Sequence, residues 1–128
     1  MNLLLDTHIA LWAIIDSPRL PEAARKLILS PENRLWVSSA TVWEIAIKHA
    51  LRRTHMPLSG EQALAHFRQS GYGLLPIKPE HAAAVDGLPA LHHDPFDRIL
   101  VAQALVEPMR LLTHDATVAS YGAGIILV

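Results

Sequence analysis

Short apolar runs alternate with helix-length segments along the whole chain, and this alternation restricts the folds open to it. Runs typical of buried strands occur at residues 2–5, 35–37, 73–77, 111–112 and 125–127. Segments typical of helices lie between them, at residues 7–15, 21–29, 39–53, 59–69, 79–86, 95–106 and 116–120. Because strands that alternate with helices pair in parallel, we predict an α/β fold in which helices cover both faces of a central parallel sheet of four to five strands, a three-layer α/β/α sandwich. We expect one domain, residues 1–128, with Pro76 indicating either an edge strand or the end of the third strand.

The composition favours a protein with an extensive core and an apolar partner surface. Hydrophobic residues make up 51% of the 128 residues, and the mean hydropathy is +0.24. The longest uninterrupted apolar run, Ile9 to Ile15, is too short to cross a membrane. The chain has no cysteine, which is compatible with the cytoplasmic location we expect. A net charge of −1 excludes nucleic-acid binding by bulk positive charge, so any such contact requires a local basic patch.

Four carboxylates follow the ends of the apolar runs. Asp6 comes directly after the first run and Asp115 shortly after the fourth, while Glu44 and Asp97 lie in the helical segments between. The carboxyl ends of parallel strands meet at one edge of a sheet, so these acids are expected to converge in one crevice. Crowded carboxylates repel one another unless cations neutralise them, and oxygen ligands suit Mg²⁺ or Mn²⁺. The sequence therefore predicts a metal-dependent site for phosphoryl transfer or hydrolysis.

Three of these acids also have a purely structural explanation. Asp6 and Asp115 precede helical segments and are suitable N-caps, each worth about 1 kcal/mol. In the segment Asp94-Pro95-Phe96-Asp97, Asp94 is suited to cap the helix and Asp97 stands where a capping-box acid would. Capping alone would account for each of these residues taken singly.

Glu44 is harder to explain by local structure. Its neighbours are almost all apolar, which predicts a buried helix, and a buried charge needs a partner or a metal. Lys48 and Arg52 follow at four-residue steps, so we predict a basic strip for substrate binding that leads away from the acid along a phosphodiester path. A solvated face is the alternative for Arg52 and Arg53. The alternative is a Glu44–Lys48 ion pair at the rim of a dimer interface.

Four motifs in this order resemble those of the PIN-domain ribonucleases, and among these the VapC-type toxins of toxin–antitoxin pairs. The motifs are Leu3-Leu4-Leu5-Asp6-Thr7, Ser39 followed five residues later by Glu44, Asp97 followed by Leu100-Val101-Ala102, and Leu112-Thr113-His114-Asp115. The resemblance covers essentially the whole chain. It implies an acidic pocket at the strand ends of a PIN-like sandwich and cleavage of single-stranded or looped RNA with Mg²⁺ or Mn²⁺.

The resemblance also assigns roles to individual residues. It implies that Asp6, Glu44, Asp97 and Asp115 are the catalytic acids that hold the metal, and that Thr7, Ser39 and Thr113 are supporting hydroxyls. The spacing after Asp97 favours it as the ligand and leaves Asp94 as a cap or outer acid. The implied partners are an RNA substrate, a cognate antitoxin and a second copy in a homodimer, with no membrane. A catalytically silent PIN-like module that binds RNA or protein is the alternative function.

The remaining histidines and aromatic residues are given structural interpretations. The eight histidines form no metal-binding spacing and are expected mostly in loops and at the rim, with His93 and His114 as candidates for phosphate contacts. Trp12, Trp36, Trp43 and Tyr72 are expected in the core or an interface rather than as platforms for base stacking. No glycine-rich phosphate loop is present, so a nucleotide cofactor is not expected.

Overall fold

The computed structural model describes residues 1–52 and 55–128, which fold around one five-stranded sheet. The strands are β1 (Asn2–Leu5), β2 (Arg34–Ser38), β3 (Gly73–Leu75), β4 (Arg110–Thr113) and β5 (Ile125–Leu127). Their spatial order is β3-β2-β1-β4-β5, and every neighbouring pair is parallel. The predicted three-layer sandwich is confirmed. The strand predicted at 73–77 lies at an edge and ends at Leu75, before Pro76, so both alternatives offered for this proline hold.

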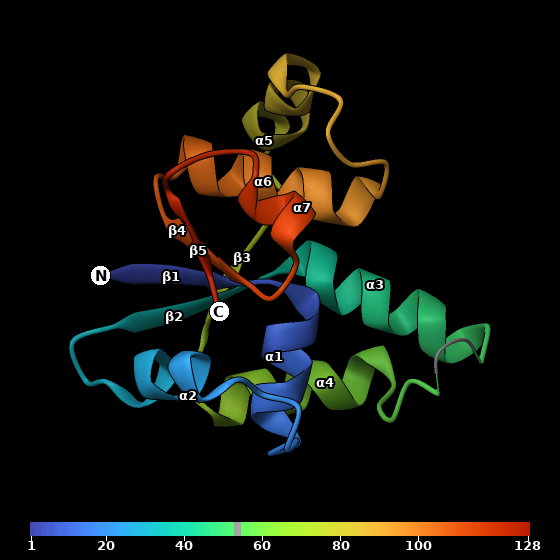
Figure 1. The fold of residues 1–128 in the computed structure, drawn as a ribbon. Coiled ribbons are helices and arrows are strands. Elements are labelled where there is room, and N and C mark those ends of the chain that lie inside the picture. Colours follow the sequence, from blue (N-terminus) through green and yellow to red (C-terminus); the bar gives the residue numbers. More distant parts are fainter. Residues whose placement is uncertain (53–54) are drawn as a thin grey trace.

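Helices cover both faces of this sheet. They are α1 (Thr7–Ile14), α2 (Glu22–Leu29), α3 (Ser39–Ala50), α4 (Gly60–Gln69), α5 (Pro79–Ala84), α6 (Pro95–Val106) and α7 (Ala116–Ala119), with a 3₁₀ turn at Val85–Gly87. Figure 1 shows α1, α2 and α4 on one side of the sheet and α6 and α7 on the other, with α5 outside α6. No helix among the described residues is long and apolar enough to cross a membrane.

The alternation of side chains along the strands divides the core into two halves. Leu3, Leu5 and Leu112 face α1, α2 and α4, where Phe67 is fully buried. Leu4 and Leu111 face the opposite side, where they pack with residues of α6 and α7. Strands that are buried on both faces have nearly continuous apolar sequences, and for this reason they could be predicted from the sequence.

Side-chain caps define where most of these helices begin. Asp6, Ser38, Ser59, Asp94 and Asp115 each accept hydrogen bonds from backbone N–H groups at the start of the next helix. Ser59 forms a full capping box with the glutamine three residues later. The cap before α3 is therefore Ser38, one of the two serines predicted for that position.

Two predicted helix ends differ from the structure. The segment expected to remain helical to residue 53 ends at Ala50, and Arg52 adopts a left-handed φ of 52° just beyond it. The segment predicted at 79–86 leaves the α-helix after Ala84 and tightens into the 3₁₀ turn. The basic strip predicted from Lys48 to Arg52 is consequently not continuous on one helix face, and Arg53 lies outside the described residues.

Candidate active site

Three of the predicted acids line one cavity at the carboxyl edge of the sheet. Asp6 follows β1, Asp115 follows the neighbouring strand β4, and Asp97 lies in the first turn of α6. The cavity has a volume of about 380 Å³ and is completed by His8, Trp12, His114 and Ala116. The parallel topology thus brings together carboxylates that are up to 109 positions apart in sequence.

Asp6 uses its two carboxylate oxygens for different purposes. Oδ1 accepts hydrogen bonds from the backbone N–H groups of His8 at 3.0 Å and Ile9 at 3.2 Å, which caps α1. Oδ2 accepts a hydrogen bond from the Thr113 hydroxyl at 2.6 Å. Burial raises the pKa of Asp6 above its ordinary value despite these donors. Thr113 therefore supports the first acid, where the sequence analysis expected it.

Asp97 has a pKa far above that of an ordinary aspartate. Burial, followed by the negative charges of Asp94, Asp6 and Glu44, raises its pKa to about 7. The neighbouring His92 acts in the opposite direction but does not offset these effects. Buried carboxylates that face one another ionise with difficulty because their negative charges repel. A bound cation would remove this repulsion.

Asp115 lies at the more exposed end of the cavity. Its Oδ1 accepts the backbone N–H of Thr117 at 2.8 Å and caps α7, while Oδ2 lies 3.5 Å from His92 Nε2. Burial works to raise the pKa of Asp115, but the backbone donors of α7 and the contact with His92 outweigh it, so the pKa lies below its ordinary value. Asp115 is therefore the acid that ionises most readily.

His92 joins two of the acids, and the sequence analysis did not single it out. Its Nε2 lies 3.2 Å from Asp97 Oδ2 and 3.5 Å from Asp115 Oδ2, and the three side chains could offer ligand atoms within 4.8 Å of one another. However, His92 Nδ1 accepts the backbone N–H of Asp94 at 3.0 Å. A neutral ring whose Nδ1 is an acceptor carries its proton on Nε2. The ring nitrogen nearest Asp97 and Asp115 therefore carries an N–H rather than the free lone pair that a metal ligand needs.

Glu44 is buried beside this cavity, but it is not one of the side chains that line it among the described residues. Its Oε1 accepts the Thr7 hydroxyl at 2.7 Å, and its Oε2 is 2.6 Å from Lys48 Nζ. The Thr7 hydroxyl also lies 3.2 Å from that of Thr41. The Glu44–Lys48 ion pair considered in the sequence analysis is therefore present, and together with the Thr7 hydroxyl it satisfies both carboxylate oxygens.

Comparison with known proteins identifies the fold family. A family model described as PIN domain matches residues 3–123. The chain belongs to the PIN-domain family. This PIN domain is 33% identical over 125 residues to ribonuclease VapC22 of Mycobacterium tuberculosis, covering 94% of this chain and 92% of that protein.

Solved structures share the architecture of this PIN domain at lower sequence identity. VapBC2 from Rickettsia felis, bound to a DNA fragment from their promoter, matches with a TM-score of 0.71 and 16% identity, covering 100% of this chain and 98% of that one. FitAcB from Neisseria gonorrhoeae matches with a TM-score of 0.63 and 20% identity, covering 97% and 96% of the two chains. At these identities the likeness concerns the fold alone.

The remaining predicted residues of the PIN domain lie outside the acidic cavity. Ser39 is exposed and lines a different groove, because the neighbouring Ser38 takes the cap of α3. Asp94 caps α6, as predicted, with Oδ1 accepting from Phe96 N at 2.8 Å. Arg52 is exposed beyond the end of α3. Of the three supporting hydroxyls, Thr7 and Thr113 contact acids and Ser39 does not.

The expectation that the histidines occupy loops and rims is wrong for one of them. His81 in α5 is fully buried, with Nε2 2.5 Å from Glu107 Oε2, and this contact lowers the pKa of Glu107. Its Nδ1 accepts the backbone N–H of Lys78 at 3.0 Å. His114 does line the acidic cavity, whereas His93 lines a separate one.

The donor set of this PIN domain fits a hard divalent cation. The groups that converge are carboxylate oxygens from Asp6, Asp97 and Asp115, which are the ligands that Mg²⁺ and Mn²⁺ prefer. No cysteine competes for a softer metal, and His92 Nδ1 already accepts the backbone N–H of Asp94.

Proposed function

We propose that this PIN domain is a metal-dependent endoribonuclease and the toxin of a toxin–antitoxin pair. The observation that carries the proposal is the convergence of Asp6, Asp97 and Asp115 in one cavity, in a chain one third identical over most of its length to a ribonuclease. The proposed cofactor is Mg²⁺ or Mn²⁺, and the proposed substrate is single-stranded or looped RNA. With no disulfide possible, the proposed location is the cytoplasm.

In this proposal Asp6, Asp97 and Asp115 hold the ion. When bound, the metal supplies an activated water and stabilises the charge that develops on the phosphate oxygens. Thr113 fixes the orientation of Asp6 by donating to Oδ2. His92 donates from Nε2 toward Asp97 and Asp115, which keeps the two carboxylates at one side of the cavity. These donors orient the ligands before the ion arrives, as outer partners do at metal sites.

We assign Glu44 the outer position among the four acids. Thr7 and Lys48 hold its two oxygens, so it adds negative charge behind Asp97 rather than facing the cavity. Lys48 then acts first as the counter-ion of Glu44, which makes its proposed contact with RNA secondary. Arg52 remains a proposed substrate contact on the strength of its exposure alone.

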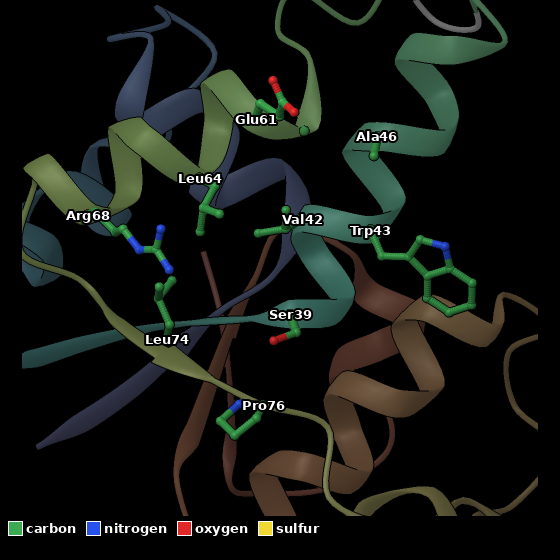
Figure 2. A pocket seen from close by; sticks show the side chains of 10 residues that line it. Ser39, Val42, Trp43, Ala46, Glu61, Leu64, Arg68, Leu74 and Pro76 are labelled. Atoms are coloured by element: carbon green, nitrogen blue, oxygen red, sulfur yellow. The ribbon is translucent and has the colours of Figure 1, made fainter.

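An antitoxin and a second copy are the proposed protein partners. Solved complexes named VapBC share this fold, and the chain offers apolar surface for such partners. A groove of about 660 Å³ lies between α3 and α4. Figure 2 shows Val42, Leu64 and Leu74 toward its centre, with Glu61 and Arg68 nearby. Trp43, which is 58% exposed, stands on the α3 side of this groove and packs against Phe96.

Cleavage of a fluorescent single-stranded RNA tests the proposed activity. Purified protein should cut the RNA with Mn²⁺ or Mg²⁺, not with EDTA, and the variants Asp6→Asn and Asp97→Asn should be inactive. Both variants should remain folded, because asparagine can still cap α1 at position 6 and the cap of α6 is Asp94, not Asp97. Equal cutting by the variants would show that the site is misassigned. Metal-independent RNA binding without cleavage would favour the silent binding module instead.

A further inference from the structure

A second cleft adjoins the acidic cavity on the α1 side. It has a volume of about 510 Å³ and shares two lining residues, His8 and Trp12, with that cavity. Its far wall carries Arg19 and His55, together with Met56 and Pro57. The two hollows therefore adjoin at one turn of α1, where His8 and Trp12, four positions apart on the same helix face, line both.

Trp12 stands at the junction of the two hollows. Its ring centroid is 5.7 Å from that of His8 in a tilted arrangement and 5.9 Å from that of His114 in an edge arrangement. The side chain is half-buried, with part of it against the core beneath α1. These contacts hold the indole in place, which lowers the entropic cost of using it as a binding surface.

The charges of the two hollows are opposite in sign. The acidic cavity carries Asp6, Asp97 and Asp115, whereas the titratable side chains at the far wall of the second cleft are Arg19 and His55. Arg19 has no side-chain hydrogen bond or ion pair with another described residue, while its backbone N–H donates to the Ser17 hydroxyl. Across residues 1–52 and 55–128, its guanidinium is thus available for an anion.

We propose that this second cleft is a nucleotide subsite of the ribonuclease, an inference that rests on the proposed function. A base adjacent to the scissile phosphate stacks on Trp12, and a neighbouring phosphate lies against Arg19. Proteins that bind single strands combine an aromatic platform with cationic side chains along the backbone path. Here the carboxylates lie in one hollow, the Trp12 indole at the junction and the Arg19 guanidinium in the other hollow. An RNA strand that leaves the acids along α1 would meet these groups in that order.

This subsite would favour unpaired RNA over paired RNA. A base can stack on Trp12 only when it has left its own helical stack, so a paired strand would not fit the cleft. Stacking on an indole discriminates little between bases, so the subsite would select single-stranded character rather than one sequence. Trp12 packs against the core, as the sequence analysis predicted, and it is the remaining exposed part of its side chain that we propose for base stacking.

Two substitutions at Trp12 and two matched charge changes test the subsite. Trp12→Leu keeps apolar bulk against the core but removes the aromatic face, whereas Trp12→Phe retains a ring. Arg19→Gln removes the proposed phosphate contact. Arg34→Gln is the charge control. Arg34 is the first residue of β2, at the amino ends of the strands and so opposite the acidic site, and it lies over the Trp36 ring. Circular dichroism and thermal melting establish that each variant is folded.

Binding of a short, mixed-sequence, fluorescein-labelled RNA is measured by anisotropy in EDTA, and cleavage is measured separately with Mn²⁺. Trp12→Leu should weaken binding about five- to 100-fold and raise KM more than it lowers kcat, while Trp12→Phe should recover most of the affinity. Arg19→Gln should reduce the slope of log affinity against log salt by about 0.7, and Arg34→Gln should leave it unchanged.

The outcomes separate the subsite from the proposed function. If the wild type cleaves RNA but folded Trp12→Leu binds and cleaves as the wild type does, the subsite is refuted and the ribonuclease stands. If Trp12→Leu instead loses a co-purifying antitoxin while RNA binding is unchanged, the cleft is a protein-docking surface and the proposal is also refuted. If the wild type binds RNA through Trp12 but never cleaves it with metal, the ribonuclease fails and the subsite stands.

Discussion

Replacing Asp97 by asparagine should make the metal-free protein more stable at alkaline pH. In the unfolded chain an aspartate ionises near 3.8, whereas in the fold burial and three neighbouring carboxylates raise the pKa of Asp97 to about 7. Below 3.8 both states hold the proton, and between the two values only the folded state does. Stability of the wild type should therefore fall as pH rises through this window and level off above about pH 7.

The size of the effect follows from the two pKa values. At about 1.4 kcal/mol per pH unit, the difference corresponds to at most about 4 kcal/mol. The Asp97 side chain is 18% exposed, and solvent screening reduces charge effects at such a site, so we expect about 2 kcal/mol. For a chain of this length that is about 6 to 10 °C in melting temperature. Asparagine cannot ionise, so Asp97→Asn should gain this amount above pH 7 and nearly nothing near pH 4.

Urea unfolding of both proteins in EDTA, across this pH range, measures the difference directly. Asp115→Asn is a control of opposite sign, because the lowered pKa of Asp115 means that its carboxylate stabilises the fold above its unfolded pKa. That variant should lose stability at alkaline pH. A stability difference between wild type and Asp97→Asn that did not change with pH would refute the electrostatic reasoning.

Three further substitutions probe separate parts of the structure. Lys48→Met leaves the Glu44 carboxylate buried without its cation, so urea unfolding should show a loss of about 3 kcal/mol; unchanged stability would mean that Glu44 finds another donor. Gly73→Ala places a Cβ 2.5 Å from the Trp36 ring, and thermal melting should reveal a cost of about 1 to 3 kcal/mol. His92→Ala removes an N–H donor to the acids, so kcat should fall about 10- to 100-fold and Mn²⁺ binding followed by EPR should weaken. Full activity in that variant would remove His92 from the site.

The fold could be predicted because its determinants are local in sequence. Each central strand is a continuous apolar run, and nearly every helix begins at a capping side chain. The end of α3 could not be predicted in this way. No glycine or proline follows Ala50 before Pro57, and the helix ends where Arg52 adopts a left-handed conformation.

The acids of the site could be placed from the sequence, but their partners could not. The convergence of Asp6 and Asp115 follows from strand polarity alone. The position of His92 depends instead on a loop that the Tyr121 hydroxyl holds by accepting the His92 backbone N–H at 2.9 Å, across 29 positions of sequence. The burial of His81 had one indication in the sequence. His81 lies three residues after Lys78 and two after Pro79, at the position where a capping side chain is expected.

The different partners of the two carboxylate oxygens in Asp6 and in Asp115 have a genetic consequence. In each residue one oxygen holds the start of a helix while the other faces the cavity. Aspartate and asparagine codons differ by a single base, and asparagine caps helices about as well as aspartate. A cell under pressure to silence the gene product could thus abolish its chemistry by one point mutation at Asp6 without provoking degradation of the polypeptide. Such silenced alleles would still be translated and could still sequester any partner that recognises the outer surface.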